Sequence, residues 1–389
     1  MEQLFQYSNQ LIAKVSNDFN RYVYNEINWQ NRLIGLLGPR GVGKTTLVLQ
    51  YMKENLDVSN SLYVTTEDFY FATNSLIDLA GNFVKYGGKN LFIDEIHKYP
   101  DWSRELKLIY DYHKDLKIVF TGSSVLDIKK GSFDLSRRAV VYTMQGLSFR
   151  EYLGLFYQID LPKFSLQDIL NRQVNVPQLT HPLPLFKKYV QEGYYPFAKE
   201  EDFEIKLQQV VNQTLENDIP SFAGMHVSTG RKLIRLMGVI AQSVPFKPNM
   251  TKIAEMLQIS RNNVADYLLN MEDAGMITQV RHQTEGVRLL GKIDKVYLDN
   301  TNLISVLAKE NKNIGNIRET FFINQVRVKH QVTSSSIADF RIDDVEFEIG
   351  GKQKGQKQIK QASKGYVVKD DIETSFLNTI PLWHFGMLY

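Results

Sequence analysis

The residues with the clearest potential for chemistry are Gly38-Pro39-Arg40-Gly41-Val42-Gly43-Lys44-Thr45, which read G-x-x-x-x-G-K-T. This is the pattern of a phosphate-binding loop. The glycines let the backbone turn inward, so that several N–H groups point at one anion. The lysine would reach the β- and γ-phosphates of a nucleotide, and the Thr45 hydroxyl would bind Mg²⁺. We therefore expect residues 38–46, with Thr46 as the last, to bind ATP and Mg²⁺.

The segments on either side of this loop have the required character. Leu33–Leu37 is a short apolar run, as expected of a buried parallel strand. Thr45–Gln50 contains no glycine or proline and is predicted to open a helix, whose N-terminus would add its positive dipole end to the site. The order strand, loop, helix separates a true phosphate-binding loop from a chance match.

A second pair of candidates ends the apolar run Leu91-Phe92-Ile93-Asp94-Glu95. Asp94 fits the acid that holds the Mg²⁺ shell. Glu95, one residue further on, fits the general base that polarises the attacking water. Acidic residues also end strands without any chemistry. A position some fifty residues after the phosphate-binding loop suits an ATPase of this class and favours the catalytic interpretation.

A third apolar run, starting at Lys117, ends in Phe120-Thr121-Gly122-Ser123-Ser124. In ATPases with a catalytic glutamate, this strand inserts between the phosphate-loop strand and the Asp-Glu strand. Thr121 or Ser123 could then sense the γ-phosphate or position water. The alternative is an ordinary Ser/Gly turn after a strand, and the residues alone do not separate the two.

Further strands are predicted at Leu62–Thr65 and Ala139–Tyr142, with helical stretches such as Ser103–His113 between strands. This alternation predicts an α/β fold with a parallel sheet and helices on both faces. Just before the last strand lie Arg137 and Arg138. A guanidinium there could complete a neighbouring subunit's site in a homo-oligomer, or the pair could simply be solvated.

The composition sets bounds on the whole chain. It has 389 residues, which predicts two to four domains. The net charge of +3 tolerates nucleic acid as a partner but does not require it. Because there are no cysteines, disulfides, Cys-ligated zinc and thiol catalysis are excluded. Residues 1–30 hold scattered charges and no long apolar stretch, so we expect no signal peptide. No 18-residue apolar run occurs, and we expect a cytoplasmic protein without a membrane partner.

Five motifs of the chain occur together in one known group. They are Arg40–Thr46, Phe92–Lys98, Phe120–Ser124, Leu147–Tyr152 and the turn Gly193-Tyr194-Tyr195-Pro196. With them the chain resembles the prokaryotic AAA+ ATPases, relatives of the archaeal-type ATPases, that pair an AAA core with a C-terminal domain of unknown function. The resemblance implies a P-loop core that hydrolyses ATP, and in this group Arg138 matches an arginine that usually follows a glycine. Here Arg137 takes the glycine's place, which leaves open which arginine would act.

We predict four parts: an ATPase core at 1–155, a helical lid or connector at 156–235, a winged helix at 236–308 and a small α/β domain at 309–389. In the connector, four prolines between 160 and 185 suggest irregular chain, and Phe186–Phe222 reads as helical.

The third part has the pattern of a helix-turn-helix followed by a wing. Thr251–Leu257 is amphipathic, and Ser260 is a good N-cap for a second helix that Gly275 ends. Met276–Val280 and Val287–Leu298 are the candidate wing strands. The residues expected to face outward and to contact DNA are Arg261, Asn262, Asn263 and Tyr267. Acidic residues on the same helix leave packing against the core as an equal alternative.

The last part follows the order found in restriction-endonuclease-like domains. A helix at Asn316–Lys329 carries Glu319, a strand at Ala338–Arg341 carries Asp339, and a strand at Val345–Ile349 carries Glu348. In such domains Asp and Glu hold Mg²⁺, and a lysine two residues after the Glu orients water. That position is Gly350 here, and the nearest lysine is Lys352. We therefore expect the fold with its activity lost or marginal.

The leading hypothesis is an ATPase whose core moves the winged helix and the C-terminal domain, with DNA as the candidate target. A second hypothesis is a slow nucleotide-dependent switch that acts through a protein partner. A third, an ATP-coupled nuclease, depends on Asp339 and Glu348 being active.

Overall fold

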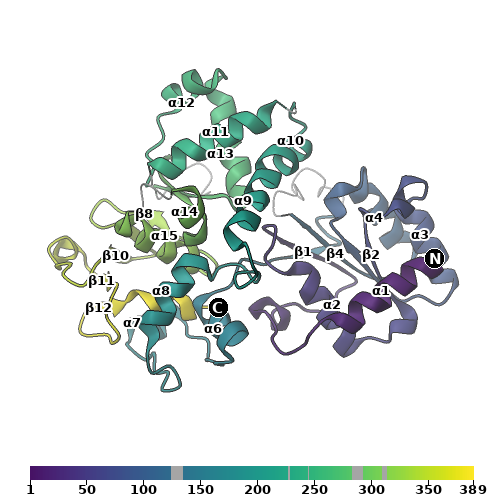
Figure 1. Cartoon of the computed structure of the whole chain (residues 1–389), viewed down its shortest axis with the longest axis horizontal. Helices are drawn as coiled ribbons and strands as arrows, with labels where there is room; N and C mark the ends of the chain where they lie inside the picture. The colour runs from purple at the N-terminus through teal and green to yellow at the C-terminus, as the bar shows by residue number, and fades with distance from the viewer. Residues whose placement is uncertain (124–134, 227, 244, 283–291, 309–312) are drawn as a thin grey trace. The chain divides into compact units, whose positions relative to one another are not determined.

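The computed structural model describes residues 1–123, 135–226, 228–243, 245–282, 292–308 and 313–389 (Figure 1). The chain forms two compact units, Met1–Gln145 and Gly146–Tyr389. The first unit thus ends ten residues before the predicted boundary at 155. The finer division into four parts stays a prediction.

A parallel sheet forms the centre of the first unit. Its strands have the order β2-β3-β4-β1-β5, and every neighbouring pair is parallel. β4 therefore lies between β1 and β3, as predicted for an ATPase with a catalytic glutamate, and the α/β fold is confirmed. The strands are β1 (Leu33–Gly38), β2 (Ser61–Thr65), β3 (Asn90–Asp94), β4 (Lys117–Ser123) and β5 (Val140–Thr143).

Helices accompany this sheet in two pairs. α1 packs on α2, and α3 packs on α4, and Figure 1 draws the pairs on opposite sides of the strands. The apolar faces of α3 and α4 are buried, and α3 starts at a capping box between Ser75 and Asp78. The helices are α1 (Glu2–Lys14), α2 (Lys44–Asn55), α3 (Leu76–Lys85) and α4 (Trp102–Tyr112).

The second unit begins with helices. Capping boxes start α6 and α7, and Pro182 lies in the first turn of α8, where its missing N–H costs nothing. A π-helical turn at Thr214–Asp218 joins α9 to α10. The helices are α6 (Phe149–Tyr157), α7 (Leu166–Leu170), α8 (Pro182–Glu192), α9 (Phe203–Gln213), α10 (Ile219–Phe222) and α11 (Thr229–Gln242).

Next come α12 (Met250–Leu257) and α13 (Arg261–Asp273), followed by an antiparallel pair of strands, β6 (Ile277–Arg281) and β7 (Ile293–Leu298). The Ser260 side chain caps α13, as predicted, by accepting the Asn263 N–H. Of the predicted wing, residues 287–291 lie outside the described part of the chain. Two helices and a strand pair fit the predicted order, and the winged-helix assignment itself stays a prediction.

The prediction for one residue of α13, Tyr267, was wrong. Tyr267 was expected to face outward, but its side chain is only 6% exposed. It lies three residues after the buried Val264, and helix geometry puts residues with that spacing on the same face. Arg261, Asn262 and Asn263 are exposed, as expected.

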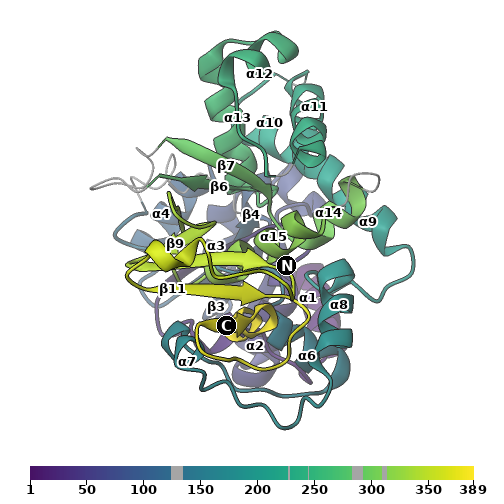
Figure 2. The same ribbon diagram turned by 90° about the vertical axis from the view of Figure 1, so that its left-hand side faces the viewer.

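The C-terminal part is built on a mixed five-stranded sheet with the order β12-β11-β10-β9-β8, which Figure 2 shows in yellow and green beside the β6–β7 pair. β10, β11 and β12 are parallel to one another, whereas β9 is antiparallel to both of its neighbours, β10 and β8. The elements are α14 (Thr301–Leu307), α15 (Ile314–Val326), β8 (Thr333–Ser334), β9 (Phe340–Ile342), β10 (Val345–Gly350), β11 (Gly365–Lys369), β12 (Thr379–Pro381) and the 3₁₀ helix η8 (Leu382–Met387).

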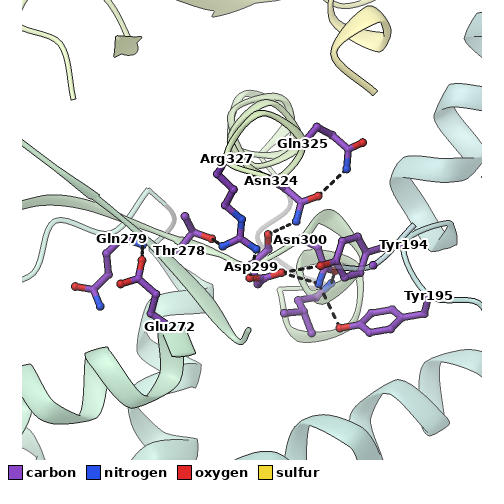
Figure 3. Close-up of polar contacts among 12 residues, drawn as sticks. Tyr194, Tyr195, Glu272, Thr278, Gln279, Asp299, Asn300, Asn324, Gln325 and Arg327 are labelled. Atoms are coloured by element: carbon purple, nitrogen blue, oxygen red, sulfur yellow. Dashed lines mark hydrogen bonds and ion pairs between the residues drawn. The ribbon is translucent and has the colours of Figure 1, made fainter. Parts of the chain in front are cut away.

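A buried ion pair in the second unit joins Arg327 to Asp299 (Figure 3). Arg327 directly follows α15, and its Nη2 atom lies 2.5 Å from Asp299 Oδ1. Asp299 is fully buried. The Tyr194 hydroxyl donates to the second oxygen of Asp299, 3.3 Å away, so the Gly193–Pro196 turn belongs to this cluster. Asn324 donates to the Asp299 carbonyl at 2.9 Å. A buried charge pair is tolerated when its remaining polar atoms are satisfied. Here Arg327 Nη1 also donates to the Thr278 hydroxyl, whereas Arg327 Nε has no hydrogen-bond partner among the described residues.

Candidate nucleotide-binding site

The loop between β1 and α2 has the backbone that its sequence predicts. Gly41 and Gly43 have φ angles of 81° and 96°, a left-handed backbone region that glycine adopts far more easily than any residue with a Cβ atom. Gly38 is equally restricted, since a Cβ atom there would lie 2.1 Å from the carbonyl oxygen of Met144. The Lys44 side chain is buried, and its ammonium donates to the carbonyls of Gly38 and Pro39 at 2.9 and 3.0 Å. A cationic group thus folds over a loop shaped for an anion.

The Asp94 carboxylate is the meeting point of three hydroxyl groups. Thr45 and Tyr63 donate to Oδ2 at 2.8 and 2.6 Å, and Thr121 donates to Oδ1. Asp94 is 5% exposed, so these hydroxyls take the place of its water shell. Mg²⁺ in a nucleotide site is bound by one or two carboxylates together with phosphates. The buried Asp94 carboxylate, which accepts from the Thr45 hydroxyl, fits that set of ligands.

Glu95 leaves the end of β3 in the left-handed conformation, with φ 52° and ψ 40°. Its N–H donates to the Thr121 hydroxyl at 3.2 Å, and its carbonyl accepts from the Thr66 hydroxyl at 2.6 Å. Its carboxylate lies 3.3 Å from His97 Nε2. Burial raises the pKa of Glu95, and the charges of Lys44 and Arg40 oppose that rise. A carboxylate with a raised pKa is a better proton acceptor near neutral pH.

Thr121 joins the two acidic residues. Its hydroxyl donates to the Asp94 carboxylate and accepts the Glu95 N–H. The register of β4 against β1 pairs Ser123 with Gly38, so the tip of β4 lies beside the start of the phosphate-binding loop. The Thr121 hydroxyl thus contacts both acidic residues. That Thr121 or Ser123 senses the γ-phosphate or positions water stays a prediction.

Arg138 lies elsewhere in this unit. Its guanidinium forms a two-bonded ion pair with Asp111 of α4, with both nitrogen–oxygen distances 3.0 Å. Arg137 is exposed. Both are therefore at the surface of the unit, where a role toward a second copy stays a prediction.

Two residues of the site were missed from the sequence. Tyr63 lies on β2, and its hydroxyl reaches Asp94 on the neighbouring strand β3. Arg21 precedes β1 and donates to the carbonyls of Val42 and, at 2.7 Å, of Gln145. A tyrosine on a strand predicted beside the acidic strand was a usable signal for Tyr63. No local pattern marks Arg21.

The acidic residues of the C-terminal part do come together. Asp339 directly precedes β9 rather than lying within the strand, and its Oδ2 accepts the Ile349 N–H at 2.8 Å. Tyr297 donates to Glu319 at 2.5 Å. Burial and the neighbouring Asp339 charge raise the pKa values of Glu319 and Glu348. The charge of Asp339 thus acts on both Glu319 of α15 and Glu348 of β10, so the three carboxylates lie near one another.

The lysine at this cluster is not the one expected. Lys352 is exposed, whereas the Lys354 ammonium forms an ion pair with Glu348 Oε1. The chain bends back after Gly351, because the Lys354 N–H donates to the Gly351 carbonyl at 2.9 Å, and a side chain at 350 would collide with Lys354. Lys295 lies 3.9 Å from Asp339. Within the described ranges no three Asp, Glu, His or Cys side chains are arranged to hold a metal. Glu348, one of the two acids that the endonuclease resemblance assigns to Mg²⁺, is paired with Lys354 instead.

Two family models match separate parts of the chain. The AAA domain family matches residues 30–153, and a family described as "Domain of unknown function (DUF8612)" matches residues 183–313. The chain is 26% identical over 281 residues to an uncharacterised protein of Methanocaldococcus jannaschii. The match covers 67% of this chain, and the chain spans 58% of the length of that relative.

Solved structures with related arrangements include PCH-2 from C. elegans and AMPPCP-bound DnaA from Aquifex aeolicus. For PCH-2 the TM-score is 0.26 at 16% identity, over 70% of this chain and 66% of that chain. For DnaA the TM-score is 0.24 at 13% identity, over 69% of this chain and 86% of that chain. The parallel sheet of the first unit agrees with the match of residues 30–153 to the AAA domain family.

No helix in the described parts of the chain is both long and apolar enough to cross a membrane.

Proposed function

We propose that this chain, in which residues 30–153 form an AAA domain, binds ATP with Mg²⁺ at residues 38–46 and hydrolyses it. The observation that carries the proposal is the convergence of Thr45, Thr121 and Tyr63 on Asp94, directly beside Glu95. This arrangement joins a phosphate-binding loop, a metal-shell acid and a candidate base in one unit.

Each residue has a distinct part in the proposal. The N–H groups of the loop and the Lys44 ammonium bind the phosphates. Thr45 and Asp94 hold Mg²⁺, which neutralises charge on the transferred phosphoryl group when bound. Glu95 accepts the proton of the attacking water. Thr121, bonded to the backbone of Glu95, keeps that residue at the end of the strand.

For the rest of the chain we propose that hydrolysis drives movement of the second unit, with DNA bound through the exposed start of α13. The alternative is a slow switch that captures a protein partner in one nucleotide state. Binding of DNA that weakens steeply with salt favours the first. Co-purification of a protein with the ATP-bound Glu95→Gln chain, without DNA affinity, favours the second.

We also propose that Arg138 acts on the ATP of a neighbouring copy. Arg138→Ala should then lower ATP hydrolysis by about 10³-fold, and mixing it with a Lys44→Ala chain should restore part of the activity in mixed oligomers. Asp111→Asn is the matched control, because it removes the ion pair and leaves the arginine, and it should keep hydrolysis near the parent rate. A monomer that hydrolyses ATP and does not respond to Arg138→Ala contradicts the proposal. Arg137→Ala shows which arginine acts.

The C-terminal acidic cluster is expected not to cleave DNA. Lys354 already neutralises Glu348, and Gly350 stands where a water-orienting lysine would lie. Supercoiled plasmid should stay intact after prolonged incubation with Mg²⁺ or Mn²⁺, with or without ATP. Nicking that disappears in Asp339→Ala would overturn this expectation and favour the nuclease hypothesis.

A further inference from the structure

A buried histidine lies beside the candidate base Glu95, and the proposed function gives it no part. His97 belongs to the 3₁₀ turn η4 (Ile96–Lys98), which follows Glu95 directly and packs on β4. Its side chain is only 6% exposed, and its Nε2 atom lies 3.3 Å from Glu95 Oε2. The Glu95 side chain is 22% exposed. The ring is therefore in position to hold one carboxylate oxygen while part of the glutamate stays accessible.

The backbone on both sides of this contact is held by hydrogen bonds. The Glu95 N–H donates to the Thr121 hydroxyl at 3.2 Å. The Glu95 carbonyl accepts from the Thr66 hydroxyl at 2.6 Å and from the Lys98 N–H at 2.9 Å. Because the backbone is fixed, the carboxylate can change its position only by rotation about the side-chain bonds of Glu95. A glutamate side chain loses considerable rotamer entropy when it is fixed, so a further contact is needed to keep a base in one position.

The two oxygens of the Glu95 carboxylate have different surroundings. Oε2 is the oxygen in contact with His97, whereas no hydrogen bond within the described residues involves Oε1. Burial raises the pKa of Glu95, and the charges of Lys44 and Arg40 oppose that rise, so the carboxylate lies within electrostatic reach of the phosphate-binding loop. Oε1 is therefore the oxygen that remains for a water molecule beside the phosphates.

We propose that His97 is a positioning residue for ATP hydrolysis: its Nε2 atom donates to Glu95 Oε2 and so directs Oε1 toward the attacking water. The inference rests on the proposed function, in which Glu95 is the general base. At 3.3 Å the contact is slightly longer than an ordinary N–H···O bond, and the contacts of catalytic groups commonly tighten once the substrate is bound. His97 takes no proton in this role, because the proton of the water still goes to Glu95.

The test compares two variants whose new side chains have the same length. His97→Met removes the N–H donor, whereas His97→Gln keeps one. We expect His97→Met to lower kcat by about 10²-fold, the cost of a misplaced catalytic group, and to leave KM within about twofold of the parent value. His97→Gln should recover at least about tenfold of this loss. A side chain that only filled space in this buried position would show the reverse order, because methionine is apolar and glutamine is polar.

Two further variants show whether His97 acts through Glu95. Glu95→Gln combined with His97→Met should be no slower than Glu95→Gln alone, because no base is left to position. His113→Met is the matched control, since His113 is a histidine of the same unit that lies before the start of β4, whereas the site lies at the end of that strand. It should keep kcat and KM near the parent values.

A readout without turnover is the affinity for ADP with Mg²⁺ and aluminium fluoride, which mimics the transferred phosphoryl group and holds the attacking water. His97→Met should weaken this binding by at least about tenfold. Its affinity for a fluorescent ATP analogue, which also reports that the unit is folded, should be unchanged. If His97→Met fails to bind the analogue, His97→Leu and His97→Asn form a second pair of the same design.

The outcomes separate this inference from the proposed function. Parent-like kcat in folded His97→Met, or equal kcat in His97→Met and His97→Gln, overturns the role of His97 alone if Glu95→Gln is inactive. Hydrolysis by Glu95→Gln at the parent rate overturns the proposed base and this inference with it.

Discussion

Lys44→Ala is expected to weaken ATP binding by at least about 100-fold. The ammonium is the charge that the loop places beside the β- and γ-phosphates, and in this structure it already lies over the loop on the carbonyls of Gly38 and Pro39. Alanine removes that charge and leaves the backbone N–H groups alone with a polyanion. Titration with a fluorescent ATP analogue measures the change directly.

The control for this variant is Lys85→Ala, since Lys85 is an exposed lysine of the same unit at the end of α3. It should bind the analogue like the parent chain. Thermal unfolding of both variants checks that the loop still folds after its two lysine hydrogen bonds are gone. If folded Lys44→Ala bound the analogue with the parent affinity, the loop at residues 38–46 would not be the ATP-binding site.

Glu95→Gln is expected to keep ATP affinity and to lower kcat by about 10²–10⁴-fold. The amide has the size of the carboxylate and can hold a water molecule, but it cannot take the proton. The backbone of Glu95 is held by Thr121 and Thr66, so the substitution should leave the end of β3 in place. Single-turnover kinetics separate the chemical step from binding.

Two further variants make this result specific. Glu67→Gln changes an exposed carboxylate whose charge acts on Glu95 without replacing the base, and it should retain turnover. Asp94→Asn removes the acceptor of three hydroxyls, so it should weaken Mg²⁺-dependent binding rather than the proton transfer alone. Parent-rate hydrolysis by Glu95→Gln would place the base elsewhere.

The parts of this fold that the sequence predicts well are those with dense local signals. The phosphate-binding loop needs glycine at φ values that few other residues adopt, so the positions of Gly41 and Gly43 could be recognised from the sequence. The strands themselves can be recognised as apolar runs that end in polar residues, whereas the position of β4 between β1 and β3 was expected from the arrangement of ATPases with a catalytic glutamate. Ser260 could likewise be recognised as an N-cap, because the capping hydrogen bond from the Asn263 N–H is local in the sequence.

What the sequence does not reveal depends on contacts between distant residues. Arg21 reaches Val42 and Gln145 only after the sheet has formed. Lys354 reaches Glu348 because the chain turns after Gly351, and a fixed two-residue spacing could not anticipate it. Tyr267 was grouped with the outward residues that can contact phosphates and base edges, whereas the residue is buried in the structure because its ring packs away from water.

Release of phosphate from ATP by the purified full-length chain tests the central proposal most directly. The account predicts steady release with Mg²⁺, none when the metal is chelated, and none above background from Lys44→Ala or Glu95→Gln assayed at saturating ATP. Release that persists in both variants at the parent rate, or its absence from the parent chain despite saturating Mg²⁺ and ATP, would contradict the assignment of ATP hydrolysis to this site.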